Sequence, residues 1–268
     1  MTATDQTATL ASIAETLHQA QAGATAVAQI TATTPLTLAD AYAVQHLLVQ
    51  RRTTGGERLT GVKLGFTSRA KAQQMGVNDV IIGSLTTGMA AADGDELDHA
   101  AYIHPRIEPE VAFLLGQDID VQDDAPDLLG AVTGVAPALE VIDSRYRDFK
   151  FTLADVVADN TSAAGYVLGP WSDPGRAGDI ANRGVRLEVD GAVVSTGSTA
   201  AILGHPLRAL AAARRMARLH GFELRAGTVL LAGAATEAVP LPSGSVIEAT
   251  VAGLGRVAAR ASSRASND

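Results

Sequence analysis

Apolar positions at helical spacing mark the beginning of the chain. Within residues 10–17 the leucine and isoleucine side chains fall three or four positions apart, so they share one face of a helix. A second helix is indicated where Thr37 is followed at the third position by Asp40, the pattern of an N-terminal capping box. We therefore predict a helical segment over residues 1–56.

Short apolar runs of strand length replace the helical pattern after this segment. They occupy residues 59–64, 111–115, 136–142, 185–194, 228–231 and 245–251. Asp190 and Gly191, within one of these runs, predict a tight hairpin turn. One clear helix interrupts the strands, and we expect it to open at Pro206 and to close at Gly221.

The order of these elements predicts an α+β fold, because strands dominate and do not alternate regularly with helices. A length of 268 residues suits a single domain over residues 1–268. Within it, residues 1–56 would form a helical N-terminal segment and residues 57–262 the β-rich core.

Composition and charge narrow the classes of partner. The formal net charge of -8 disfavours general binding of nucleic acid, because phosphate contacts need Lys and Arg. The absence of cysteine excludes a disulfide scaffold and a thiolate metal site. The N-terminus lacks the features of a secretion signal, and no apolar stretch approaches the roughly 18 residues of a membrane span. We expect a cytoplasmic protein with neither nucleic acid nor membrane as partner.

A pair of glutamates is the first candidate for chemistry. Glu108 and Glu110 follow His104 in a short polar run, and residues two apart on a strand point to the same face. Two carboxylates ~4 Å apart repel by roughly 4 kcal/mol at an effective dielectric near 20. One of them is therefore protonated, or a cation lies between them; the alternative is a solvated strand end, where the repulsion costs little.

Glu140 favours a buried site over a solvated strand end, because it is the one charged residue in the apolar run 136–142. Such a run is usually buried, and a buried carboxylate needs a cationic partner. That partner is either a metal ion or a basic side chain, for which Arg145 and Arg106 are near in sequence. Three carboxylates would form a site for Mg²⁺ or Mn²⁺ rather than for zinc.

Lys63 is the candidate for proton transfer. It alternates with apolar neighbours in a strand, and Gly61 and Gly65 beside it allow the close approach of a ligand. A nearby cation would disfavour its charged form and suit it to moving a proton. The alternative is a lysine whose stem lies on the surface and whose ammonium group reaches solvent.

Two polar clusters, residues 143–150 and 159–162, follow the apolar run closely. Either could bind a carboxylate, and either could consist of ordinary loop and capping residues. His205 precedes a proline at a helix start, where a capping or packing role is expected. No dinucleotide or phosphate-loop motif is present.

Taken together, these segments resemble the fumarylacetoacetase-related hydratase and decarboxylase family of aromatic meta-cleavage pathways. The matching motifs are Gly-Val-Lys-Leu-Gly-Phe-Thr-Ser (61–68), His-Pro-Arg-Ile-Glu-Pro-Glu (104–110), Leu-Glu-Val-Ile-Asp-Ser-Arg-Tyr (139–146), Val-Val-Ala-Asp-Asn (156–160), Ala-Ala-Ile-Leu-Gly-His-Pro-Leu (200–207) and Gly-Leu-Gly-Arg-Val (253–257). The resemblance implies a mixed sheet rolled on itself with helices outside. It also implies an active site, with Mg²⁺ or Mn²⁺ on Glu108, Glu110 and Glu140, and with Lys63 as a catalytic residue.

The decarboxylase branch of this family is the more similar one. That branch removes carbon dioxide from 2-oxo-3-hexenedioate, whereas the hydratase branch adds water to 2-hydroxypenta-2,4-dienoate. Hydratases carry an aspartate two residues before the glycine that matches Gly83, and this chain has Ile81 there. Asp79 is nearby, and a shifted alignment would bring it to that position.

The resemblance also implies a substrate and partners. The substrate would be a 2-oxo dicarboxylic acid, whose carboxylates would be held by Ser68, Arg145, Asn160 and Ser162. We expect a homo-oligomer that can associate with a homologous hydratase. The alternatives are the hydratase itself and a non-catalytic partner of a hydratase.

Overall fold

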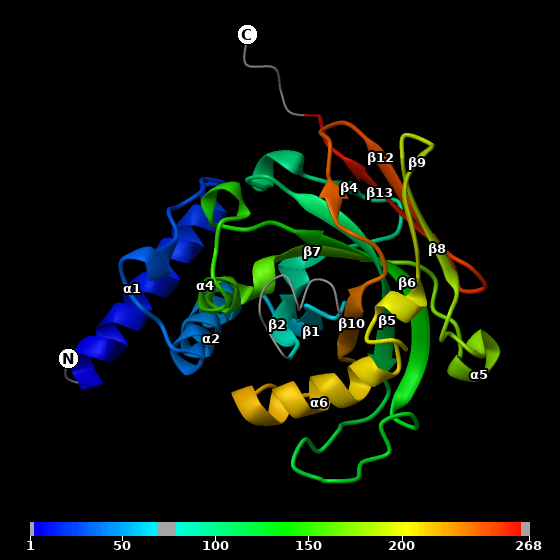
Figure 1. The fold of residues 1–268 in the computed structure, drawn as a ribbon, viewed down its shortest axis with the longest axis horizontal. Helices are drawn as coiled ribbons and strands as arrows, with labels where there is room; N and C mark the ends of the chain where they lie inside the picture. Colours follow the sequence, from blue (N-terminus) through cyan, green and yellow to red (C-terminus); the bar gives the residue numbers. More distant parts are fainter. Residues whose placement is uncertain (1–2, 69–78, 264–268) are drawn as a thin grey trace.

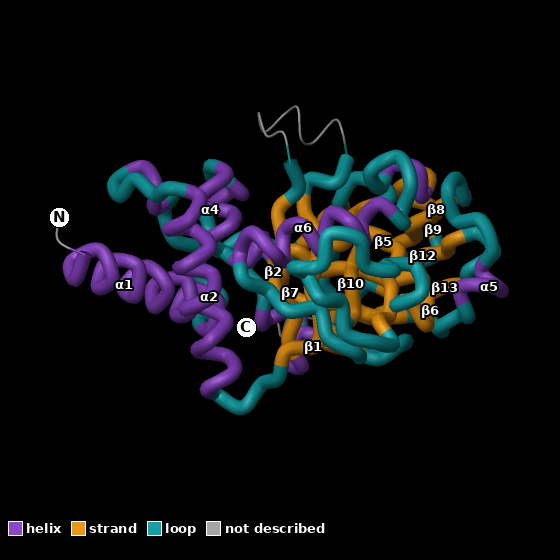
Figure 2. Tube along the Cα trace, turned by 90° about the horizontal axis from the view of Figure 1, so that it is seen from below, coloured by secondary structure: helices purple, strands orange, loops and turns teal. Residues whose placement is uncertain are grey.

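The structure is a computed structural model that describes residues 3–68 and 79–263. Figure 2 shows α1, α2 and α4 gathered at one end of the molecule and the strands at the other. The helices are α1 Ala3–Ala22, α2 Leu38–Thr54, α4 Leu153–Ala158, α5 Pro174–Ala177 and α6 Arg208–His220. The capping box that opens α2 is confirmed, since the Thr37 hydroxyl accepts from the amide of Asp40 and the Asp40 carboxylate accepts from the amide of Thr37.

The larger sheet is mixed and carries the candidate residues. In spatial order its strands are β2 Ile81–Thr86, β1 Leu59–Gly65, β10 Val229–Ala234, β5 Arg106–Leu115, β6 Val132–Ile142, β7 Ala163–Leu168 and β3 Ala90–Ala91, with β11 Val239–Pro240 beside β5. The pairs β1–β10 and β3–β7 are parallel, and the others are antiparallel. Figure 1 shows the long strands β5 and β6 running through the middle of the β-rich part.

A smaller sheet packs against the larger one. Its strands are β4 Glu96–Leu97, β13 Gly255–Ala261, β12 Val246–Val251, β8 Gly184–Val189 and β9 Ala192–Ser198. The predicted hairpin joins β8 to β9, and its two turn residues Asp190 and Gly191 both have positive φ. Apolar side chains between the sheets include Leu139 and Val141 of β6 and Leu187 of β8. Because side chains alternate along a strand, Glu140 must point to the other face of β6.

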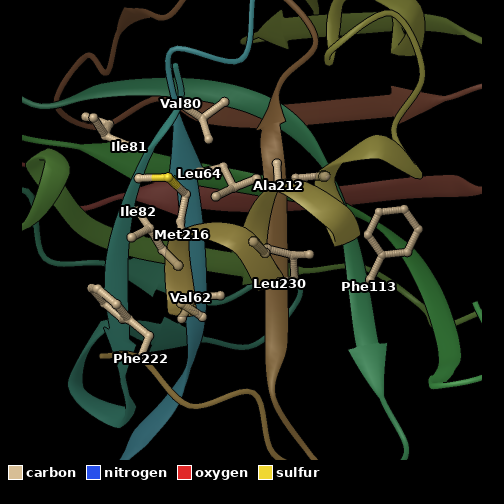
Figure 3. Packing of buried hydrophobic residues seen from close by; sticks show 14 of the residues in the cluster. Val62, Leu64, Val80, Ile81, Ile82, Phe113, Ala212, Met216, Phe222 and Leu230 are labelled. Carbon is tan, nitrogen blue, oxygen red and sulfur yellow. The ribbon is translucent and has the colours of Figure 1, made fainter. Parts of the chain in front are cut away.

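Helices cover the outer face of the larger sheet near β1, β2 and β10. Figure 3 shows Val62 and Leu64 of β1 and Leu230 of β10 lying close to Met216 of α6. The apolar face of α6 fits its sequence pattern, and Gly221 ends the helix in the left-handed conformation. The helix begins at Arg208 rather than at Pro206, after a turn formed by the preceding residues.

The predicted α+β fold with a mixed sheet is confirmed. Six strands were not predicted: β2, β7 and β13, and the two-residue strands β3, β4 and β11. The sequences of β7 and β13 are rich in Gly and Ala and give weak alternation, and two residues are too few to form a pattern. In the part of the chain that the structure describes, no helix is both long and apolar enough to cross a membrane.

Candidate functional site

Three glutamates lie side by side on two neighbouring strands. Glu108 and Glu110 are two residues apart on β5, so both side chains point to one face of the sheet. Glu140 lies on β6 directly opposite Glu108 in the strand register. One carboxylate oxygen from each glutamate lies within 4.8 Å of the others. Strand alternation and strand register together therefore bring the three carboxylates to one point.

Burial makes this cluster electrostatically costly. Glu110 and Glu140 are 0% exposed and Glu108 is 5% exposed, so the alternative of a solvated strand end is wrong. Burial, and then the charges of Glu140 and Glu108, raise the pKa of Glu110 well above its ordinary value. The charge of Lys63 and a 2.8 Å hydrogen bond from the amide of Gly233 oppose that rise. Burial also raises the pKa of Glu140, against the charge of Lys63.

Lys63 on β1 lies against the carboxylates. Its Nζ is 3.0 Å from Oε1 of Glu140 and donates a 3.2 Å hydrogen bond to the carbonyl oxygen of Thr161. It is 3% exposed, so the alternative of a surface lysine is wrong. Burial lowers the pKa of a lysine, but the charge of Glu140, with those of the other glutamates, outweighs burial and raises the pKa of Lys63. Without a bound cation, the neighbouring glutamates therefore favour the ammonium form of Lys63. The loss of the Lys63 charge that the sequence analysis expected would apply only beside a bound cation.

Several oxygens of the cluster retain the capacity to bind a cation. Among the described residues, no hydrogen bond reaches Oε1 of Glu110 or either carboxylate oxygen of Glu140, although all three atoms are buried. Lys63 approaches Glu140 at ion-pair distance but without the orientation of a hydrogen bond. Buried anionic oxygens need a cation or a donor, and an all-carboxylate set suits a hard divalent ion such as Mg²⁺ or Mn²⁺. The residues present fit such an ion.

A cleft of about 230 Å³ has one glutamate of this cluster, Glu108, in its lining. Its lining residues are Leu64, Gly65, Phe66, Thr67, Ser68, Glu108, Ala201, Ala234, Thr236 and Glu237. Ser68, which the sequence nominated for substrate binding, therefore lies on the same cleft as Glu108. A small molecule in this cleft would therefore lie against Glu108, one of the three carboxylates.

The other nominated residues lie in or beside a short turn, Asn160–Ser162, that precedes β7. Ser162 is 4% exposed, and its hydroxyl has no hydrogen-bond partner within the described residues. The side chain of Asn160 is already occupied, because its amide group donates to the carbonyl of Ser84 at 2.9 Å and its oxygen accepts from the amide of Ser84 at 2.8 Å. Ser162 fits the predicted contact with a substrate better than Asn160 does.

Arg145 is not directed at the carboxylate cluster. Its guanidinium pairs with the carboxylate of Asp159 and also donates to the main-chain oxygens of Asp143, Asp159 and Ala163. It is 1% exposed, so a substrate carboxylate would have to displace these contacts. The basic partner of Glu140 is thus Lys63, which the interpretation of the sequence did not consider for that role.

The structure also places three further residues that the sequence analysis discussed. Asp79, considered as a substitute for the aspartate of hydratases, forms an ion pair with Arg215 of α6. The side chain of Ile81 is buried in the apolar core beside the helices. His205 lies before the N-cap residue of α6, Leu207, and its Nδ1 accepts from the Leu207 amide at 3.1 Å, so it stabilises the turn that leads into the helix and does not cap the helix itself.

Sequence reasoning missed the backbone groups that hold the site together. The amide of Gly233 binds Glu110, and the carbonyl of Thr161 binds Lys63. Every residue carries such groups, so composition gives no signal for them. Only the structure explains the glycine at position 233. Its φ of 117° lies in a region that favours glycine, at the point where β10 passes the carboxylates.

Comparisons with known proteins agree with this geometry. The family described as Fumarylacetoacetate (FAA) hydrolase C-terminal matches residues 62–261. A 4-oxalocrotonate decarboxylase from a Pseudomonas species is 47% identical over 91% of this chain and 94% of its own length. A 2-keto-4-pentenoate hydratase from Paraburkholderia xenovorans is 38% identical over 91% of each chain. The solved 4-oxalocrotonate decarboxylase from Pseudomonas putida G7, complexed with magnesium and adipate, has a TM-score of 0.90 and 35% identity, covering 97% of this chain and 99% of that one.

Proposed function

The chain belongs to the fumarylacetoacetate hydrolase C-terminal family, and we propose that it is a divalent-metal-dependent decarboxylase of 2-oxo-3-hexenedioate (4-oxalocrotonate). The observation that carries the proposal is the buried group of Glu108, Glu110 and Glu140 with Lys63 against it. A purely structural module has no use for three clustered buried carboxylates, of which Glu110 and Glu140 have oxygens that accept no hydrogen bond from the described residues. The same group also argues against a non-catalytic partner of another enzyme.

Decarboxylation is favoured over hydration by the relatives and by one position in the chain. The decarboxylase relative from a Pseudomonas species, at 47% identity, is more similar than the hydratase at 38%. At the position where hydratases carry an aspartate, this chain has Ile81, which packs in the apolar core. The nearby Asp79 forms an ion pair with Arg215. Hydration of 2-hydroxypenta-2,4-dienoate remains the second candidate, because hydratases are among the relatives of this length and similarity.

Glu108, Glu110 and Glu140 would hold the metal ion, for which Mg²⁺ is the first choice and Mn²⁺ the second. The solved relative with magnesium supports that choice. When bound, the ion supplies Lewis acidity where negative charge develops on the 2-oxo group. The amide of Gly233 fixes Oε2 of Glu110, which leaves Oε1 of that residue for the ion.

The substrate is a vinylogous β-keto acid, and its electron flow defines what the residues must do. The C5–C6 bond breaks, carbon dioxide leaves, and the electron pair moves through C4 and C3 to the C2 oxygen, giving a dienolate. Protonation of that oxygen yields 2-hydroxypenta-2,4-dienoate. Lys63, whose Nζ lies 3.0 Å from Glu140, would face the developing charge and is the proposed donor of this proton. Ser68 on the cleft and the buried hydroxyl of Ser162 would hold the substrate carboxylates.

The proposed setting follows from the same relatives. We place the enzyme in the cytoplasm, in aromatic meta-cleavage catabolism, as a homo-oligomer that can associate with a homologous hydratase. Residues 57–262 would form the catalytic core and residues 1–56 a helical N-terminal segment of the same domain. Consecutive reactions support the association, because the product of the decarboxylase is the substrate of the hydratase.

The decisive experiment mixes the purified protein with 2-oxo-3-hexenedioate and Mg²⁺, with and without a chelator. Carbon dioxide release and the ultraviolet spectrum are followed together. Chelator-sensitive release establishes the decarboxylase. Consumption of 2-hydroxypenta-2,4-dienoate without gas release would instead establish the hydratase, and inertness toward both substrates in a metal-loaded protein would overturn the proposal.

A further inference from the structure

The turn that contacts Lys63 has an unusual backbone. Asn160, Thr161 and Ser162 have φ values of 47°, 53° and 59°, so three successive residues other than glycine occupy the left-handed region. That region disfavours residues with a Cβ, and such a run persists only where the surroundings enforce it. All three residues are at most 4% exposed, so the turn belongs to the interior beside the glutamates.

Asn160 fastens one side of this turn to β2. Its side-chain amide makes a two-way pair with the main chain of Ser84, donating to the carbonyl and accepting from the amide. The two hydrogen bonds, of 2.8 and 2.9 Å, resemble those between the main chains of neighbouring strands. It therefore fixes the turn relative to the strand that neighbours β1, on which Lys63 lies.

Arg145 fastens the two ends of the same turn. Its guanidinium donates to the main-chain oxygens of Asp159 and Ala163, the residues that immediately precede and follow the turn. It also pairs with the Asp159 carboxylate, which in turn accepts from the Arg145 amide at 3.0 Å. One buried side chain thus binds both flanks of a three-residue turn.

At the middle of the turn, the carbonyl oxygen of Thr161 accepts the hydrogen bond from Nζ of Lys63. A lysine ammonium is a compact charge at the end of a flexible stem, so its position depends on the acceptors around it. Here the ammonium group donates a hydrogen bond to this carbonyl and lies at ion-pair distance from the Glu140 carboxylate. The orientation of the turn therefore decides where the ammonium group lies relative to the carboxylates.

We propose that Asn160 is a positioning residue that acts through this left-handed turn to hold Lys63, with Arg145 as the clamp of the turn. The inference rests on the proposed function of Lys63 in decarboxylation. It replaces the earlier expectation that Asn160 and Arg145 bind the substrate carboxylates directly. The two roles are separable, because a substrate-binding residue affects KM, whereas a residue that positions Lys63 affects kcat.

The test compares Asn160→Ala and Asn160→Gly with wild type and with Asn182→Ala, at an exposed asparagine that does not line the cleft. Both Asn160 variants should lose about ten- to a hundredfold in kcat, the range expected when a catalytic group is misplaced by about 1 Å. KM for 2-oxo-3-hexenedioate and the Kd for Mn²⁺ should stay within about twofold. Glycine tolerates positive φ. Wild-type kcat in Asn160→Gly, together with a reduced kcat in Asn160→Ala, would show that kcat depends on the backbone conformation at position 160 and not on the pair with Ser84. That result would overturn the proposal.

A double-mutant cycle with Lys63→Met gives the sharpest answer. If Asn160 acts through Lys63, Asn160→Ala should cause no further loss of kcat in the Lys63→Met background. Equal loss in both backgrounds, or a rise in KM with kcat preserved, would overturn the proposal. Arg145 variants are less suitable, because removal of a fully buried ion-pair partner threatens folding itself.

A crystal structure of metal-loaded Asn160→Ala tests the inference independently of any substrate. The expected result is a displaced Thr161 carbonyl and the loss of its hydrogen bond with Nζ of Lys63. An unchanged turn with that bond intact would overturn the positioning role, even if wild type is active. If wild type proves inactive on the substrate, the proposed function fails, whereas this geometric test still decides whether Asn160 holds Lys63.

Discussion

Nζ of Lys63 lies 3.0 Å from Oε1 of Glu140, although β10 and β5 separate their strands in the sheet. Neighbouring strands are about 4.8 Å apart, so a flat sheet would place these two main chains roughly 14 Å apart. Curvature of the sheet and two long side chains on its inner face close that distance. The candidate site is therefore a product of how the sheet rolls, since no single loop carries it.

Glu110→Gln should abolish metal-dependent turnover while the fold stays intact. Glu110 is fully buried, and its free Oε1 is one of the three oxygens that would hold the cation. Loss of a ligand should weaken Mn²⁺ binding by more than about tenfold. Because the substitution also removes one of three mutually repelling carboxylates, the metal-free variant should have a higher Tm than metal-free wild type. Calorimetry for Mn²⁺ and thermal unfolding measure both effects.

Glu15→Gln is the matched control for this substitution. Glu15 lies on the exposed surface of α1 and pairs with Arg51, away from the cleft. It should leave turnover, metal affinity and Tm close to wild type, because solvent screens an exposed ion pair and its contribution to stability is small. Wild-type turnover at unchanged metal affinity in Glu110→Gln would remove the glutamate cluster from the mechanism.

The stabilisation given by Mg²⁺ should increase with pH. Burial and neighbouring charges raise the pKa of Glu110 well above 4.5 and raise that of Glu140 too. A carboxyl with a raised folded-state pKa stabilises the protein below its unfolded value, and that contribution is lost as pH rises through the raised value. The metal-free protein should therefore lose stability as pH rises above 4.5, whereas a bound cation compensates the charges.

Thermal unfolding between about pH 5 and about pH 8, with and without Mg²⁺, measures this difference. Because protons compete with the ion for the same oxygens, binding should also release protons. Titration calorimetry in two buffers of different ionisation enthalpy detects that release. A pH-independent shift in Tm together with no proton release would show that the carboxyls are already ionised in the metal-free protein.

Lys63→Met should separate the charge of this residue from its volume. The variant leaves Glu140 without its cationic partner, and breaking a buried pair in this way costs about 3–5 kcal/mol. Metal-free Lys63→Met should therefore unfold at a lower Tm, and Mg²⁺ should restore much of the loss. Removal of a positive charge beside the site should at the same time tighten Mg²⁺ binding.

Turnover of Lys63→Met should fall by about a hundredfold or more, the scale of a general acid–base contribution. Lys150→Met, at an exposed position, is the control and should change neither Tm nor turnover. Steady-state kinetics at saturating Mg²⁺ make the comparison. Turnover near wild type in the lysine variant, with the metal bound, would leave Lys63 as a purely structural counter-ion.

The sequence predicted the elements whose local patterns are strong. The capping box at Thr37, the hairpin at Asp190 and the left-handed end of α6 at Gly221 depend on neighbouring residues, and all three are present. Strands such as β7, with the sequence Ala-Ala-Gly-Tyr-Val-Leu, are stabilised by pairing within the sheet rather than by their own pattern. Long-range pairing of that kind leaves no local trace.

The candidate site was predictable only where it depends on local features of the sequence. The spacing of Glu108 and Glu110 and the apolar surroundings of Glu140 are local features that mark buried carboxylates. The partner of Glu140 was not predictable, because Lys63 reaches it only across the rolled sheet. The contacts of Arg145 with both flanks of the turn likewise depend on tertiary packing and could not be read from a polar run.

Gly83→Ala should disturb the turn that holds Lys63 without removing any polar group of the site. Gly83 lies opposite Lys63 in the register of β1 and β2. A Cβ there would overlap the hydroxyl of Thr161 and approach the main-chain oxygen of Asn160 to 2.9 Å, so the buried turn must shift. Overpacking of this kind costs typically about 1–3 kcal/mol, and kcat should fall because the Thr161 carbonyl moves with the turn.

Gly184→Ala is the matched control, since nothing lies within 4 Å of the Cβ it would add at the start of β8. It should keep the wild-type Tm and kcat, which would exclude a general effect of adding a methyl group to a strand. Thermal unfolding and kinetics with 2-oxo-3-hexenedioate compare the two variants directly. If Gly83→Ala loses stability but keeps full kcat, the turn can move without moving Lys63. The proposal that the turn determines the position of the Lys63 ammonium group would then be wrong.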